Sequence, residues 1–315
     1  MTIGKNKKIA IACQGGGSHT AFAAGALREF LRQEKQPFEI VGLSGTSGGA
    51  ICALMAWYGL AKGNRQQAIE LLNDFWNQIA AIEPWDIFFN FSMVWTARLQ
   101  GAVALPEISP YFFPSFGQDR LRNVLENLVN FDEAKQIARV SNLKLFVGAV
   151  DVLSGDFKVF RGEEVTIEAI LGSTALPTLF KAVHIDRGVY WDGLFSRNPP
   201  IRDLCHLRPD EIWVIQINPQ KRHEEPKLVH EIQDRRNELA GNLSLNQEIH
   251  FIKTINELLE KNLLINSHYR PITVRRLEFT QELDFASKLD RSPSFLKDIV
   301  TFGEERAAEF IKGVF

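Results

Sequence analysis

Two serines in the stretch VGLSGTSGGAI, residues 41–51, are candidates for a nucleophile. Ser47 lies at the centre of GTSGG, a complete G-x-S-x-G pattern, whereas Ser44 lacks the second glycine. A nucleophile on a sharp turn from strand to helix needs neighbours with almost no side chain two residues away on each side. The pattern therefore favours Ser47. The alternative is a glycine-rich turn whose serine caps a helix.

Gly15, Gly16 and Gly17 follow a short apolar run and precede a helical pattern. Their unencumbered backbone amides would form an oxyanion hole if adjacent parallel strands brought this loop beside Ser47. A dinucleotide-binding loop is not expected, because Thr20 replaces the last glycine of G-x-G-x-x-G and the chain has no Walker A sequence. The alternative is a tight turn without chemistry.

The serine also needs a proton acceptor. His250 and His268 lie late enough in the chain to complete a Ser-Asp-His order, but one falls in an amphipathic helical pattern and the other in INSHYRP, so both are expected at the surface. Asp192 ends a short apolar run before Gly193. An acidic side chain at the carboxyl end of a strand, where parallel-sheet sites form, is a better base, although Asp-Gly is also typical of a turn.

These blocks occur in the order GGGSHT (15–20), GTSGG (45–49), GSTALPTLF (172–180) and DG (192–193), and together they resemble the patatin family of serine lipid acyl hydrolases. Residues 234–249 and 287–311 are similar to bacterial members, so the resemblance covers roughly residues 8–312. It implies a three-layer α/β/α sandwich around a mostly parallel sheet. It also implies a Ser–Asp dyad that needs no histidine, metal or cofactor.

In that resemblance, Ser47 is the nucleophile, Asp192 is the general base, and Gly15, Gly16 and Gly17 line the oxyanion hole. Four other positions depart from the family pattern: the usual acidic residue is replaced by Gln14, the usual Arg or Lys by His19, the usual Gly by Thr20, and a small residue by Leu194. His19 would either tune the loop by protonation below about pH 6.5 or be a solvent-exposed residue at the start of a helix.

The elements that must position these residues alternate along the chain. Strands are predicted at 8–13, 38–43, 143–150, 157–162, 211–217 and 272–279, and helices at 21–33, 49–61, 227–264 and 295–311. Strands that alternate with helices predict βαβ units and a mainly parallel sheet covered on both faces, an α/β fold. One domain over residues 1–315 is the simplest organisation.

Residues 83–117 interrupt this alternation with nine aromatic residues and four prolines, which predicts an inserted cap. Six of the aromatic side chains are expected to form the wall of an acyl-chain pocket or to contact a membrane: Trp85, Phe88, Phe89, Phe91, Trp95 and Phe113. The alternative is ordinary core packing of one or two extra helices.

The bulk composition adds few constraints. The chain has 315 residues, 45% of them hydrophobic and 23% charged, with a net charge of -2, which gives no reason to expect a nucleic-acid partner. Its three cysteines lie in apolar runs without a CxxC and are expected to be buried thiols. No apolar run is long enough for a signal peptide or a membrane span, so a cytoplasmic protein, free or peripheral at membranes, is expected.

The expected function is hydrolysis of lipid acyl esters through an acyl-enzyme. Two alternatives stay open: a small-ester esterase, thioesterase or acyltransferase on the same dyad, and a catalytically impaired lipid-binding protein. The head group, the acyl position and the oligomeric state are not indicated by the sequence.

Overall fold

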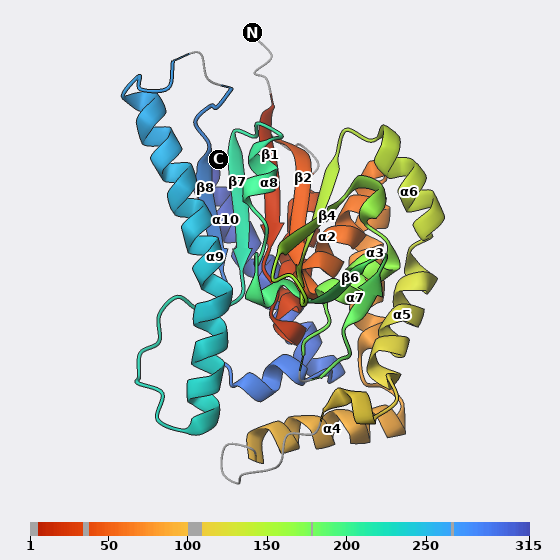
Figure 1. The fold of residues 1–315 in the computed structure, drawn as a ribbon. Helices are drawn as coiled ribbons and strands as arrows, with labels where there is room; N and C mark the ends of the chain where they lie inside the picture. The colour runs from red at the N-terminus through yellow and green to blue at the C-terminus, as the bar shows by residue number, and fades with distance from the viewer. Residues whose placement is uncertain (1–5, 34–37, 100–108, 178, 266–267) are drawn as a thin grey trace.

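The computed structural model describes residues 6–33, 38–99, 109–177, 179–265 and 268–315 (Figure 1). Its strands form one eight-stranded sheet in the order β5-β6-β3-β2-β1-β7-β8, with β4 paired to β3. In chain order the strands are β1 (Lys7–Cys13), β2 (Phe38–Thr46), β3 (Lys144–Asp151), β4 (Phe157–Arg161), β5 (Val183–Ile185), β6 (Gly188–Asp192), β7 (Glu211–Gln216) and β8 (Thr273–Glu278).

Five neighbouring strands, β3-β2-β1-β7-β8, run parallel, which confirms the mainly parallel sheet. β4 and β6 run antiparallel to β3, and β5 runs antiparallel to β6. Cys13 at the end of β1 pairs with Gly45 of β2 on one side and with Ile215 of β7 on the other. The loops that follow these three strands therefore meet at one edge of the sheet.

Helices connect and cover the strands. In chain order they are α1 (Ala21–Arg32), α2 (Gly48–Ala61), α3 (Arg65–Ile79), α4 (Pro84–Leu99), α5 (Phe116–Leu128), α6 (Phe131–Val140), α7 (Ile167–Ser173), α8 (Arg202–Cys205), α9 (Val229–Glu260) and α10 (Pro293–Val314). Short 3₁₀ turns are η1 (Gly17–Thr20), η2 (Pro110–Phe112), η3 (Gly162–Glu164), η4 (Gly193–Phe195) and η5 (Phe285–Leu289). The sequence patterns had not indicated α3, α5 or α6.

The sheet separates two apolar cores. Ile9 and Ile11 of β1 belong to the core that α1, α2, α3 and α10 cover, whereas Ala10 and Ala12 belong to the core under α8 and α9. Both sets are fully buried, because alternate side chains of a strand point to opposite faces and each face is covered by helices. This arrangement confirms the three-layer α/β/α sandwich.

The predicted cap at 83–117 contains α4 and η2, and its residues 100–108 lie outside the described part of the chain. The helical segment between β2 and β3 is longer than the prediction, since it runs from α2 through α6. α4 lies across the end of the molecule toward which β1 runs (Figure 1). Within the described residues, no helix is both long and apolar enough to traverse a bilayer.

Candidate active site

Ser47 is the single residue between β2 and α2. Its backbone has φ 56° and ψ -134°, a conformation that residues with side chains rarely adopt. A Cβ atom on Gly45 would lie 2.4 Å from the carbonyl oxygen of Gly49, and one on Gly49 would lie 2.3 Å from that of Cys13. Steric crowding therefore explains both glycines of the motif. The turn is sharper than predicted, because β2 continues to Thr46 rather than ending at Leu43.

The other serine of the motif, Ser44, lies inside the sheet. Ser44 is fully buried within β2 and pairs with Ala12 of β1 and with Phe146 of β3. Its hydroxyl has no hydrogen-bond partner among the described residues. Ser44 is therefore far less accessible to a substrate than Ser47, as the sequence pattern indicated.

Asp192 lies beside Ser47 at the end of β6 and is 3% exposed. Its carboxylate accepts hydrogen bonds from the Ser47 side chain and, at 2.9 Å, from the amide of Leu194. Burial raises the pKa of Asp192 to about 7, and the two hydrogen bonds oppose that rise. A carboxylate with a pKa near neutrality is well matched to accept a proton from a hydroxyl.

The route by which Asp192 reaches the site differs from the prediction. It was expected at the carboxyl end of a parallel strand, but β6 is antiparallel to β3, with Asp192 opposite Ala149. β6 thus enters from the edge where the parallel strands end and delivers its last residue next to the end of β2, since Gly148 of β3 pairs with Thr46. Two strands that run in opposite directions bring the two side chains together.

The glycine loop, Gly15–Gly17, lies beside Ser47 as predicted: a Cβ on Gly15 would be 2.8 Å from that of Ser47. The amide of Gly15, however, donates a 2.7 Å hydrogen bond to Oδ1 of Asn198. The amides of Gly16 and Gly17 have no hydrogen-bond partner in the described part of the chain. The free donors of this loop are therefore at its second and third glycines.

Gln14 fastens the glycine loop to the neighbouring segments, a role that sequence reasoning missed. Its Oε1 accepts from the amides of Ile217 and Asn218 at 2.9 and 2.8 Å. Its Nε2 donates to the carbonyl oxygen of Asn198 at 3.2 Å and to Oδ1 of Asn242 at 2.9 Å. A carboxylate at this fully buried position could not make the last two bonds, which accounts for an amide where an acidic residue is usual in the resemblance.

Ser173 holds the backbone of Ser47 in place. Its hydroxyl oxygen accepts a 3.0 Å hydrogen bond from the amide of Ser47 and its proton goes to the carbonyl oxygen of Gly148 at 2.7 Å. Ser173 is fully buried at the end of α7. The block GSTALPTLF contained this residue, but nothing in the sequence indicated its contact with the turn.

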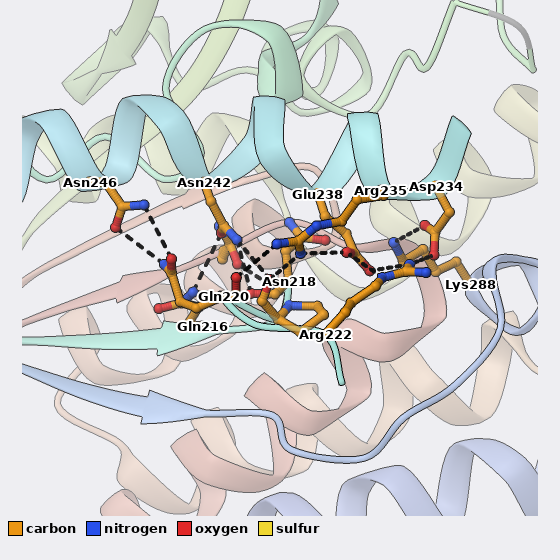
Figure 2. Close-up of polar contacts among 12 residues, drawn as sticks. Gln216, Asn218, Gln220, Arg222, Asp234, Arg235, Glu238, Asn242, Asn246 and Lys288 are labelled. Atoms are coloured by element: carbon orange, nitrogen blue, oxygen red, sulfur yellow. Dashed lines mark hydrogen bonds and ion pairs between the residues drawn. The ribbon is translucent and has the colours of Figure 1, made fainter. Parts of the chain in front are cut away.

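α9 presents a polar stripe to the loop that follows β7 (Figure 2). The stripe has the four-residue spacing of one helix face and consists of Asp234, Glu238, Asn242 and Asn246. Figure 2 shows these side chains contacting Gln216, Asn218, Gln220, Arg222 and Lys288. This stripe therefore attaches two segments to α9: the loop that follows β7, and η5 through Lys288.

His19 is only 3% exposed, so the solvent-exposed interpretation is wrong. Its ring packs against Phe279 and Phe295, and its Nε2 lies 2.8 Å from the Ser287 hydroxyl oxygen. Burial first, and then the nearby charge of Lys288, lower the pKa of His19 to about 3. The expected protonation below about pH 6.5 is therefore wrong as well. His250 and His268 are exposed, as predicted.

A cavity of about 420 Å³ opens at Ser47 and Asp192. Its lining is mainly apolar and comes from α2, α3, α5, the segment after α7, and η5: Ile51, Phe75, Trp76, Ile79, Leu121, Leu176, Leu179, Phe180 and Leu289. From residues 83–117, the described lining residues are Met93 and Gly117. The expectation that the six aromatic residues line the cavity is therefore wrong, because its aromatic lining comes from Phe75 and Trp76 of α3, Phe180 after α7 and Phe285 of η5.

The six aromatic residues expected in that wall are exposed to solvent. Trp85 is 76% exposed, Phe88 and Phe89 are each 60% exposed, and Phe91, Trp95 and Phe113 also belong to the exposed class. The alternative of ordinary core packing is wrong for the same reason. Five of these residues lie on α4, and Phe113 directly follows η2.

The cysteine, histidine and acidic side chains of the described residues form neither a disulfide nor a metal-binding cluster. All three cysteines are free thiols; Cys13 and Cys52 are buried, as expected, whereas Cys205 is only half-buried. No three His, Cys, Asp or Glu side chains of the described segments lie together so that they could hold a metal ion.

The family model of patatin-like phospholipases matches residues 11–204, a range that includes Gly15–Gly17, Ser47 and Asp192 and ends before α9. Among solved structures, VipD from Legionella pneumophila is similar with a TM-score of 0.48 and 13% identity, over 98% of this chain and 67% of that one. The type III effector protein ExoU matches with a TM-score of 0.40 and 12% identity, over 96% and 53%. No curated protein matches the chain.

Proposed function

The chain belongs to the patatin-like phospholipase family, and from that premise we propose that it hydrolyses lipid acyl esters with Ser47 as nucleophile and Asp192 as base. The observation that carries the proposal is the hydrogen bond from Ser47 to a buried carboxylate whose pKa is about 7. At neutral pH a substantial fraction of such a carboxylate is ionised. It can therefore take the serine proton directly, without an intervening histidine.

The reaction would proceed in two halves. Ser47 Oγ attacks the ester carbonyl carbon while its proton passes to Asp192, and the amides of Gly16 and Gly17 stabilise the oxyanion. The tetrahedral intermediate collapses, and Asp192 returns the proton to the departing alcohol oxygen. A water molecule, deprotonated by Asp192, then attacks the acyl-enzyme. When the bond between the acyl carbon and Ser47 Oγ breaks, Asp192 returns this proton to Oγ, which releases the carboxylic acid and regenerates the Ser47 hydroxyl.

The start of α2 favours the same chemistry. The first amides of a helix carry a partial positive charge and point away from the helix, here toward the turn at Ser47. The amide of Gly15 already donates to Asn198, so it is not free to bind an oxyanion. Gly15 contributes instead by having no side chain. The oxyanion assignment is accordingly Gly16 and Gly17, with Gly15 as the residue that lets the loop approach Ser47.

The apolar cavity favours a fatty acyl chain over a small acid. Its volume of about 420 Å³ lies within the range of ligand pockets, and its walls offer hydrocarbon contacts beside the nucleophile. A thioesterase or acyltransferase on the same dyad would use the same cavity. The choice between them depends on the leaving group and the acceptor, and the cavity walls define neither. Activity on thioesters and acyl transfer to alcohols are therefore measured alongside hydrolysis.

The test is labelling with a fluorophosphonate probe. Wild-type protein should be labelled at one peptide, Ser47→Ala should abolish labelling, and Ser44→Ala should leave most of it. Asp192→Asn should lower kcat on a chromogenic ester by at least ~10³, as loss of the base does in a serine hydrolase. Substitution of His250 or His268 should cost less than about tenfold. Labelling that survives Ser47→Ala, or none in wild type, contradicts the proposal.

A further inference from the structure

Large hydrophobic side chains are concentrated on one outer surface of the molecule. They lie on α4 and η2, and we define the aromatic face by six of them: Trp85, Phe88, Phe89, Phe91, Trp95 and Phe112. Each is between 45% and 80% exposed. Exposed apolar side chains that occur singly are ordinary, but five large aromatic ones on a single helix, with a sixth on η2, indicate an interaction site.

α4 is an amphipathic helix with its polar side turned toward the protein. Asp86 pairs with Arg120 and Arg291, and Arg98 pairs with Asp284, at distances of 2.5 to 2.8 Å. Asn90, between them on the same face of the helix, is buried and bonds to the side chain of Asp290. Asp86, Asn90 and Arg98 therefore attach the helix to the rest of the protein.

The opposite side of α4 carries no paired charge. Of the charged residues in 84–99, Asp86 and Arg98 are engaged with the protein, and 109–117 contain none. Phe88 and Phe89, and likewise Phe91 and Trp95, form edge-on ring contacts with each other on the exposed side. An uncharged, aromatic surface does not suit an acidic or basic partner. It suits the boundary between lipid head groups and acyl chains, where Trp and Phe partition.

The aromatic face is continuous with the cavity at the nucleophile. Met93 of α4 and Gly117 at the start of α5 line that cavity, and both belong to the segment that carries the aromatic face. Figure 1 shows α4 across the end of the molecule beyond the carboxyl end of β1, the end at which the nucleophile turn lies. An acyl chain that leaves a lipid surface under α4 would pass Met93 before it meets Ser47.

We propose that the aromatic face seats the protein on a lipid bilayer, with α4 lying in the plane of the interface, so that lipids enter the cavity from the membrane. This inference deepens the proposed function and rests on it for the identity of the substrate. Because the face lacks charge, binding depends on apolar burial rather than on anionic lipids. It should therefore be insensitive to salt.

The test uses Ser47→Ala protein and vesicles of pure phosphatidylcholine, so that binding is measured without turnover. We expect co-sedimentation with the vesicles that changes less than twofold between 0.1 and ~0.5 M NaCl, since screening weakens only charge-driven binding. Phe88→Glu combined with Trp95→Glu should lower the partition coefficient at least tenfold. Phe112→Glu is a second variant, on η2. The matched control is Val140→Glu, because Val140 is 83% exposed at the end of α6, away from this face.

Several outcomes would overturn the inference. They are an absence of binding to the vesicles, binding by the aromatic variants that equals that of the Ser47→Ala protein, and binding that requires anionic lipids. A fourth is a dimer, seen by light scattering, that does not bind vesicles and that the aromatic variants dissociate. The last result would make the face a contact between two copies. Labelling of wild-type protein by a soluble fluorophosphonate reports on the dyad alone. A failure of the membrane inference is therefore distinguishable from a failure of the proposed function.

Discussion

Oδ1 of Asn198 accepts a 2.7 Å hydrogen bond from the amide of Gly15 and so joins the loop that follows Asp192 to the glycine loop. Asn198 is fully buried, and its backbone carbonyl oxygen also accepts a hydrogen bond from Nε2 of Gln14. Its Nδ2 has no partner among the described residues, although Asn198 lines the cavity. This one side chain therefore links the segment that follows Asp192, the proposed base, to the glycine loop whose amides are proposed to bind the oxyanion.

Asn198→Ala removes the acceptor that holds the Gly15 amide. We expect kcat to fall by about 10- to 100-fold with a smaller change in KM, because a misplacement of about 1 Å at the reacting groups costs this much. The matched control is Asn246→Ala, which removes another amide of the polar network, bonded to Gln220 rather than to the glycine loop. A variant of Asn198 that loses stability but keeps the wild-type kcat would show a structural role only.

The pKa of Asp192 predicts a pH dependence of catalysis. The carboxylate must be ionised to accept the serine proton, so kcat/KM on a soluble short-chain ester should rise with pH and level off above about pH 7. Below that midpoint the rate should fall about tenfold per pH unit. The measurement is kcat/KM from pH 5 to 9. A profile that is flat down to pH 5 would mean that Asp192 is not the group that limits the reaction.

The same group predicts a pH dependence of stability. Burial raises the folded-state pKa of Asp192 from 3.8 to about 7, so the folded protein binds this proton more tightly than the unfolded chain does. The stability that this proton contributes is complete below about pH 4 and is lost as the pH rises to 7, a difference of about 4 kcal/mol at most.

Asp192→Asn should therefore be more stable than wild type at pH 8, and the difference should shrink to less than half at pH 5. Urea unfolding at the two pH values measures the free energy of unfolding. Ser47→Ala is the control, since it leaves the carboxylate buried and should keep the wild-type trend. A stability difference that does not depend on pH would contradict the shifted pKa.

His19→Arg should destabilise the fold rather than improve the glycine loop. The ring is enclosed by Phe279 and Phe295, and a guanidinium there would be a buried charge close to Lys288, while the nearby Asp234 and Asp284 are already paired with other cations. A buried charge without a partner typically costs about 3–5 kcal/mol. His19→Gln, which stays neutral and can still bond to Ser287, should cost less in urea unfolding. Wild-type stability of the arginine variant would show that its side chain escapes to solvent.

Chain-length preference should depend on the residues that line the cavity and not on the aromatic face. Leu179→Ala or Phe180→Ala enlarges the cavity and should shift the preferred acyl chain to a longer one in a series of chromogenic esters, with little loss of stability because both side chains are half-buried. Phe113→Ala is the control, since it is 54% exposed and does not line the cavity. A shift caused by Phe113→Ala alone would contradict this assignment of the wall.

The sequence by itself determined the kind of sheet, and it singled out Ser47, the proposed nucleophile, at the turn where the sheet presents it. GTSGG is informative because a Cβ at Gly45 or Gly49 would lie too close to a backbone oxygen, so only glycine fits at these positions. Such local crowding can be inferred from the residue types alone. The alternation of apolar strands with helices likewise predicted a parallel sheet with two covered faces. Asp192 was also identified, although for a strand of the wrong direction.

The tertiary structure alone decided the partners of these residues and which side of α4 faces outward. The hydrogen bond between Gly15 and Asn198 joins positions 183 residues apart. The residue type of a glycine does not indicate which acceptor its amide will bond to. The aromatic residues of 83–99 have the composition of a core. Asp86 pairs with Arg120 and Arg291 and the buried Asn90 bonds to Asp290, so this side of α4 faces the protein and the aromatic side faces outward. Hydrophobicity drives burial, but the long-range polar contacts of Asp86 and Asn90 require this side of the helix to face the protein.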